Sequence, residues 1–213
     1  MIDFVILSHL HWDHIGTPSD FTKSTFIVGP GALDLLRHGG DPSTTGSHSH
    51  FETDLLPTER TIELPLPGQQ SSQNTKIELP GIATPQWKPI ADFPHAIDVF
   101  EDGSLFIVNA PGHLQGHINL LARTGLENWV YLAGDACHDR RLLRGELSIA
   151  EWEKYEKMCC IYVDKAKTEE TLERIRGLEG GGRDDQKVEV ILAHDREWID
   201  ERRDEERFWP GKL

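Results

Sequence analysis

Short apolar runs separated by polar segments dominate the first third of the chain. Residues 2–7, 25–28 and 61–64 are rich in β-branched and aromatic side chains, which predicts three strands, the first of them buried. Residues 31–38 have helical spacing. Residues 39–58 are rich in Gly, Pro, Ser and Asp, which predicts a long surface loop or a lid over a site, with His48 and His50 exposed in it.

The rest of the chain favours strands first and helices later. An Asp102-Gly103 turn between residues 97–100 and 105–108 predicts a hairpin, and residues 118–122 and 129–132 predict another strand pair. Residues 69–76 form a polar tip, and prolines at 89 and 94 favour irregular structure over 87–95. Helices are predicted over 148–160 and 168–176, a loop at 180–182, a last strand over 187–193 and a solvated helical face over 200–206.

These elements predict an α/β fold with helices packed outside sheets. Periodicity does not decide between one sheet and a sandwich of two. The 213 residues contain no internal repeat and no boundary beyond the loops, so we expect a single domain over 1–213.

Charge and cysteine content exclude several classes of protein. The chain has 22 Lys and Arg against 36 Asp and Glu, a net charge of −14, which disfavours nucleic-acid and anionic membrane partners. No apolar run reaches the roughly 18 residues of a membrane helix. Three cysteines cannot build a disulfide framework, which suits a reducing compartment, so we expect a cytoplasmic protein.

Histidine is unusually abundant, with 11 residues, and its placement carries the chemistry. His9, His11, Asp13 and His14 lie within six residues, directly after the first predicted strand. Side chains two apart after a strand tend to point the same way, so His9 and His11 could approach one metal while Asp13 and His14 serve another. The alternative is a set of surface or capping residues. Imidazoles with a carboxylate suit Zn²⁺, and less selectively Fe or Mn.

Three further strands end in residues of the same kinds. His113 follows a Pro-Gly turn after residue 108, Asp135 follows a Gly after residue 132, and His194 ends the last strand. Each alone is more often an ordinary cap or turn residue. Together they place metal-ligand types at four strand ends, where α/β proteins often bind ligands.

The series His9-x-His11-x-Asp13-His14, Pro111-Gly112-His113, Gly134-Asp135 and His194 resembles the motifs of the metallo-β-lactamase superfamily, in the family's order. The resemblance implies an αβ/βα sandwich with two metals, zinc first, at one edge of two sheets. It assigns one metal to His9, His11 and His113, the second to Asp13, His14 and His194, and a bridging role to Asp135. His11 stands where the superfamily's flavodiiron oxygen reductases usually carry Glu, which favours hydrolysis over redox chemistry.

Residues 8–16, 110–117 and 134–138 are most similar to the branch of N-acyl-homoserine lactonases. The resemblance implies hydrolysis of a lactone or related ester by a metal-bound hydroxide, with Asp13 as ligand and proton shuttle. His138 stands where those lactonases carry a Tyr that touches the substrate carbonyl. An imidazole can donate the same hydrogen bond or protonate the leaving alkoxide. Alternatively, the change from Tyr to His indicates that the substrate is a different ester.

The chain begins eight residues before His9, whereas the family has several strands before this motif. We therefore expect an incomplete first sheet, whose exposed edge would favour homo-oligomers or instability. Two other functions stay open: a glyoxalase II-like thioesterase, which would need a basic pocket for a carboxylate, and a non-catalytic metal-stabilised remnant. RNA phosphodiester hydrolysis is disfavoured by the net charge.

Other residues near the motifs have simpler interpretations. We expect Cys137 to be a packed thiol rather than a nucleophile, and Trp12 to belong to the core or a pocket wall. His117 and Asp195 are predicted to orient the neighbouring metal ligands.

Overall fold

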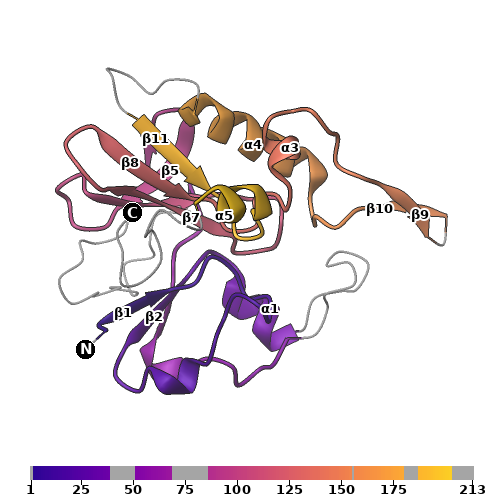
Figure 1. Ribbon diagram of the computed structural model, residues 1–213. Helices are drawn as coiled ribbons and strands as arrows, with labels where there is room; N and C mark the ends of the chain where they lie inside the picture. Colours follow the sequence, from indigo (N-terminus) through magenta and orange to yellow (C-terminus); the bar gives the residue numbers. More distant parts are fainter. Residues whose placement is uncertain (1, 39–50, 69–85, 155, 180–186, 203–213) are drawn as a thin grey trace.

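The computed structural model describes residues 2–38, 51–68, 86–154, 156–179 and 187–202. They form a three-stranded sheet, a six-stranded sheet and a two-stranded hairpin, with helices on the outer faces of the two larger sheets (Figure 1). The predicted segments 39–50, 69–76, 180–182 and 203–206 lie outside the described residues, and so do His48 and His50.

The small sheet is parallel, in the order β1-β2-β3, with strands β1 (Phe4–Ile6), β2 (Thr25–Val28) and β3 (Thr61–Glu63). Short 3₁₀ helices, η1 (Pro18–Asp20) and η2 (Thr58–Arg60), precede β2 and β3. Because side chains alternate along a strand, Phe26 and Val28 pack against α1 (Ala32–His38), while Ile27 packs toward the large sheet.

The large sheet is mixed and has the order β11-β8-β7-β6-β5-β4. Its strands are β4 (Lys88–Ile90), β5 (Phe93–Asp98), β6 (Leu105–Asn109), β7 (Ile118–Arg123), β8 (Asn128–Leu132) and β11 (Lys187–Ile191). Neighbouring positions again face opposite sides: Ile107 packs between the sheets, whereas Val108 packs under the helices.

Helices α3 (Arg140–Leu143) and α4 (Lys165–Glu179) cover the outer face of the large sheet (Figure 1). Leu143, Leu172 and Ile175 of these helices are fully or almost fully buried against Tyr131 and Val190. Helix α5 (Arg196–Arg202) follows β11. The layers are thus helix, sheet, sheet and helix, which confirms the predicted αβ/βα sandwich. No described helix is long and apolar enough to cross a membrane.

Two predictions of secondary structure are wrong. Residues 87–95 are not irregular, because they contribute to the antiparallel strands β4 and β5. Pro89 is tolerated because β4 is the edge strand of the sheet, and the pairing of β4 with β5 shifts register between Lys88 and Ile90.

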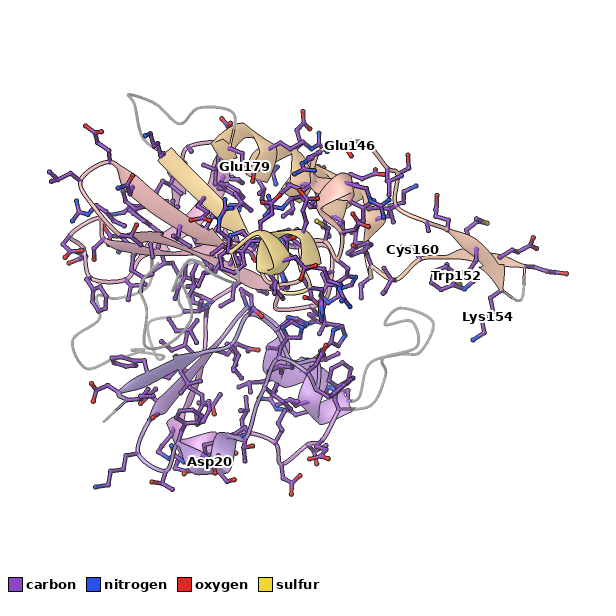
Figure 2. All side chains as sticks on the ribbon, in the orientation of Figure 1. Asp20, Glu146, Trp152, Lys154, Cys160 and Glu179 are labelled. Atoms are coloured by element: carbon purple, nitrogen blue, oxygen red, sulfur yellow. The ribbon has the colours of Figure 1, made fainter. Side chains whose placement is uncertain are left out.

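The helix predicted over 148–160 is replaced by a hairpin of β9 (Trp152–Lys154) and β10 (Lys157–Cys159). Glu and Lys favour helices, but here the chain reverses through Glu156, which has a φ of 60°. The hairpin extends away from the body of the molecule, as the labels of Trp152 and Lys154 show (Figure 2). We expected this segment to pack on a sheet, but it does not, because Trp152 and Met158 are exposed.

Candidate metal centre

The candidate ligands follow strands that run in the same direction. Strands β8 and β11 are parallel, and β6 is two antiparallel pairings away from β8, so all three run the same way. Their carboxyl ends therefore meet at one edge of the sheet, where His113, Asp135 and His194 follow them. A backbone hydrogen bond from Ile118 N to Ser8 O, 2.8 Å long, joins the segment after β1 to this edge.

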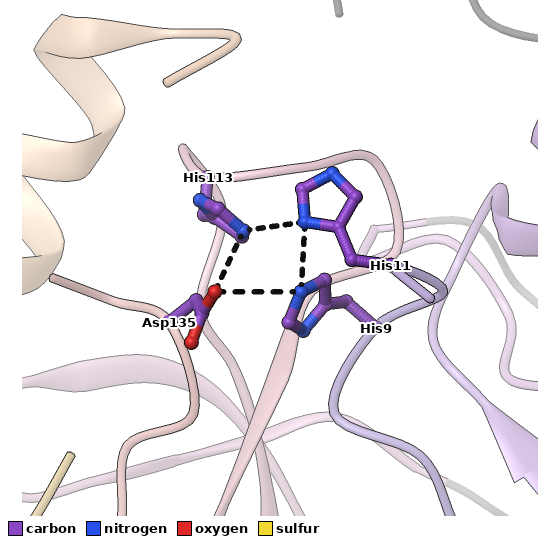
Figure 3. Close-up of side chains that lie close together, drawn as sticks. All are labelled: His9, His11, His113 and Asp135. Atoms are coloured by element: carbon purple, nitrogen blue, oxygen red, sulfur yellow. Dashed lines mark hydrogen bonds and ion pairs between the residues drawn. The ribbon is translucent and has the colours of Figure 1, made fainter. Parts of the chain in front are cut away.

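The first group of side chains is buried and contains His9, His11, His113 and Asp135 (Figure 3). The Nε2 of His9 lies 3.0 Å from the Nδ1 of His11, which lies 3.0 Å from the Nε2 of His113. The Oδ2 of Asp135 completes the ring, 3.3 Å from the Nε2 of His113 and 3.7 Å from that of His9.

The second group contains Asp13, His14 and His194 and is more exposed. The Nε2 atoms of His14 and His194 lie 3.3 Å apart, and 3.6 and 3.5 Å from the Oδ2 of Asp13. The Oδ1 of Asp135 faces this group, 3.3 Å from His14 Nε2 and 3.4 Å from His194 Nε2. The two carboxylate oxygens of Asp135 are therefore divided between the two groups.

The spacings within both groups also fit the ligand shells of metal ions. Zinc–nitrogen bonds of about 2.0–2.1 Å in a tetrahedron place neighbouring donor atoms about 3.3 Å apart. The donor atoms of both groups lie 3.0 to 3.7 Å from their neighbours. In addition, the nitrogens nearest to the buried Oδ1 of Asp135 are two imidazole Nε2 atoms, of His14 at 3.3 Å and of His194 at 3.4 Å, as expected if one cation lay between them. The seven residues brought together are those that the family resemblance assigned to two metals, and their role as ligands stays a prediction.

Burial sets the protonation of the first group. It lowers the pKa of His9 far below its usual value and the pKa of His113 to about 2, with repulsion from neighbouring imidazoles adding to both. Burial alone would raise the pKa of Asp135, but hydrogen bonds from His138 and His14 hold it well below the usual range. Neutral imidazoles beside an ionised carboxylate are the states in which these groups bind metals.

His117 contacts the backbone of the segments that carry the candidate ligands, and the sequence predicts such an orienting role. Its ring is buried, its Nδ1–H donates to Ala110 O at 2.9 Å, and its Nε2 accepts from the backbone N–H of Asp135 at 3.1 Å. Gly134 lets the chain turn here with a φ of +50°, where a Cβ would lie 3.0 Å from His117 Nε2 and 3.1 Å from Ser8 Cβ. The contact with His117 therefore fixes the backbone that carries Asp135.

His138 lies in the cleft, and its Nε2–H donates to Asp135 Oδ2 at 2.9 Å. Asp135, His138 and His194 also form a third group close enough to hold a metal, so His138 is a possible ligand that sequence reasoning did not assign. Its ring stacks on Tyr162 with centroids 5.7 Å apart. Sequence reasoning missed Tyr162, because no motif surrounds it and only the fold brings it to the site.

The cleft has a volume of about 290 Å³. It is lined by His11, Asp13, His113, Asp135, His138, Ile161 and His194. Cys137 belongs to the core under the helices and is fully buried, and burial raises the pKa of its thiol to about 12, so the expectation of a packed thiol is confirmed.

Two neighbouring residues differ from expectation. Trp12 is 75% exposed and is not part of the core, because it lies on the turn between His11 and Asp13. Asp195 is not seen to orient His194: its Oδ1 accepts from Trp198 N, near the start of α5, and its Oδ2 accepts from Arg140 Nε at 2.7 Å.

Comparisons with known proteins agree with the fold. The chain is 36% identical over 146 residues to "Cytochrome P450 monooxygenase mpaDE" of Penicillium roqueforti, covering 67% of this chain and 15% of that protein. It is 31% identical over 137 residues to "Gamma-lactamase FDB1" of Fusarium pseudograminearum, covering 63% and 28%.

Solved structures show the same architecture at low sequence identity. A quorum-quenching N-acyl homoserine lactone lactonase matches with a TM-score of 0.59 and 17% identity, over 99% of this chain and 63% of that one. AidC, a dizinc quorum-quenching lactonase, matches with a TM-score of 0.55 and 14% identity, over 99% and 59%. The chain thus spans less than two thirds of each of these proteins. The family model described as "Metallo-beta-lactamase superfamily" matches residues 1–179, and the chain belongs to that superfamily.

Proposed function

We propose that residues 1–213 form one domain that holds two metal ions and hydrolyses a small-molecule lactone or a related ester. Zinc is the first candidate for both ions. One observation carries the proposal: Asp135 directs Oδ2 to His9 and His113 and Oδ1 to His14 and His194. A carboxylate divided in this way is the arrangement expected of a bridge between two cations. We keep the prediction of a cytoplasmic location.

When bound, a pair of metal ions lowers the pKa of a water molecule and polarises the substrate's carbonyl group. The chain's own residues supply the positioning and the proton transfer. The carboxylate of Asp13 lines the cleft with its side chain 32% exposed, where it can hold a proton and deliver it to the leaving alkoxide. The imidazole of His138 faces the same cleft and orients the Asp135 carboxylate.

The substrate class is supported by the comparisons and by the cleft. The proteins named above include one called a gamma-lactamase and two solved lactonases. The cleft has a volume of about 290 Å³, which suits a small lactone or ester. No serine or cysteine nucleophile is required, and the buried thiol of Cys137 does not offer one at neutral pH.

The test combines metal analysis with turnover. The purified chain, reconstituted with zinc, iron or manganese, is analysed for metal and assayed with an N-acyl homoserine lactone, an aryl ester and a thioester. We expect about two metal ions per chain and hydrolysis of the lactone or the ester. Asp135→Ala should lose metal and activity together, whereas Asp34→Ala, at an exposed position on α1, should keep both.

The outcomes separate the alternatives. Turnover of the thioester alone would favour the glyoxalase II-like reaction, and two bound metals without turnover of any substrate would favour the non-catalytic remnant. Full activity of Asp135→Ala would contradict the bridging role.

A further inference from the structure

A second cavity adjoins the candidate metal centre. It has a volume of about 260 Å³ and lies between the start of α3 and the turn that joins β11 to α5. His138 and His194 line both this cavity and the metal cleft. A molecule whose acyl group lies in the cleft could therefore extend a substituent past these two imidazoles into the second cavity.

The carboxylates that line this second cavity are already neutralised. Each forms an ion pair with an arginine of the same region: Asp139 with Arg141, Asp195 with Arg140, and Glu197 with Arg144. Arg140 is also held by Glu179 and by Val190 O, so its guanidinium has few donors left for a ligand. These pairs shape the walls of the cavity and do not provide a free charge.

Arg196 is the exception among the charged residues that line the cavity. It is exposed at the first residue of α5, and its side chain forms no ion pair or hydrogen bond with any residue that the structure describes. A guanidinium presents its N–H donors as a planar fork that matches the two oxygens of a carboxylate. On a chain with a net charge of −14, such an unpaired cation beside a reaction cleft is a local site for an anion.

We propose that Arg196 binds a carboxylate carried by the substrate, so that the compound hydrolysed at the metal centre is an anionic ester or lactone. The inference rests on the proposed function for its reaction and adds the substrate class. A single unpaired cation suits a singly charged carboxylate better than a phosphate dianion. His138 and His194 line both cavities, so the bound carboxylate would lie on their side of the metal centre, away from His9 and His11.

The experiment compares two esters with the same leaving group on the zinc-loaded chain. 4-Nitrophenyl hydrogen glutarate carries a free carboxylate, and 4-nitrophenyl valerate does not. Arg196→Gln should raise KM for the glutarate ester about 10-fold, which corresponds to about 1.4 kcal/mol, with kcat unchanged and with both constants unchanged for the valerate ester. Arg196→Lys keeps the charge and should restore part of the difference.

Arg174→Gln is the matched control, because it makes the same change of charge at a residue of α4 that is paired with Glu170 and does not line the cavity. It should leave both esters unaffected. Equal changes for the two esters in Arg196→Gln, or no change for either, would overturn the proposal.

A binding measurement separates this proposal from the proposed function. Calorimetric titration of the zinc-loaded chain with glutarate should give weaker binding for Arg196→Gln than for Arg174→Gln. If no ester is hydrolysed but this difference is found, the proposed function fails and the carboxylate site stands. If esters are hydrolysed and glutarate binds both variants equally, the carboxylate site fails and the proposed function stands.

Discussion

The backbone N–H of Asp135 donates a hydrogen bond to Nε2 of His117, and the opposite ring nitrogen of His117 donates to Ala110 O. The two bonds fix one tautomer of a buried imidazole that binds no ligand itself. They tie the segment after β8 to the segment after β6, which carry Asp135 and His113. The position of the candidate bridging carboxylate thus depends on a residue outside the seven candidate ligands.

Replacing His117 with leucine should weaken metal binding while the fold persists. Loss of a residue that orients metal ligands typically costs about 10- to 100-fold in metal affinity, and we expect an effect of that size. Competition of the zinc-loaded variant with a chromophoric chelator measures it. His38→Leu is the control, since His38 is exposed on α1, and equal chelator midpoints for the two variants would contradict the role of His117.

The stability of the metal-free chain should fall in mild acid. Burial lowers the pKa of His117 from 6.5 to about 4, so the unfolded chain takes up a proton at a higher pH than the folded chain does. Stability from this residue is therefore complete above pH 6.5 and is lost as the pH falls toward 4. From the two pKa values, lowering the pH from 7.5 to 5 should cost about 2 kcal/mol through His117 alone.

Urea unfolding at both pH values checks this prediction. The metal-free wild-type chain also loses stability through His9 and His113, whose pKa values are lowered in the same direction. The pH dependence should therefore become shallower, but not vanish, in His117→Leu. An identical slope in the two proteins would refute the assignment.

Replacing His138 distinguishes a catalytic residue from a metal ligand. We expect His138→Gln to keep two metals and to lower kcat by about 100-fold, because the variant loses an ionisable donor that lines the cleft. Metal analysis and kinetics on the same sample give both quantities. Loss of one metal from this variant would instead assign His138 to the third group of candidate ligands, with Asp135 and His194.

Cys137 should resist thiol reagents in the folded chain. Its side chain is fully buried and its thiol has a pKa of about 12, so almost no thiolate exists at neutral pH. Cys159 and Cys160 are partly exposed. Alkylation with iodoacetamide followed by mass spectrometry should label these two first, and Cys137 only after unfolding.

The sequence predicted the fold class and which side chains come together at one edge of the large sheet, whereas their role as metal ligands stays a prediction. The spacing of His9, His11, Asp13 and His14 is local information, and each further candidate ligand follows a strand that apolar runs reveal. The direction of the strands then brings the groups together, which the order of motifs anticipated. Burial of Cys137 was predicted, because it was expected to be a packed thiol.

Errors arose where strand pairing overrides the preference of the individual residues. The Glu- and Lys-rich segment around Trp152 favours a helix in isolation, but it pairs as the hairpin of β9 and β10. Proline at position 89 suggested irregular structure, yet an edge strand accepts it. The stacking of Tyr162 on His138, and the pairing of Asp195 with Arg140, join residues far apart in the chain that no sequence pattern connects.

The candidate ligands come from both sheets of the sandwich, from His9 beside the small sheet to His194 at the end of the large one. Each of the two groups contains residues from both sides, so a cation held by either group could bind only while the two sheets remain packed together. Free zinc would then shift the folding equilibrium toward the native chain, because a ligand that binds only the folded state stabilises it in proportion to the logarithm of its concentration. The fraction of the protein that is folded would therefore depend on the concentration of zinc in its surroundings.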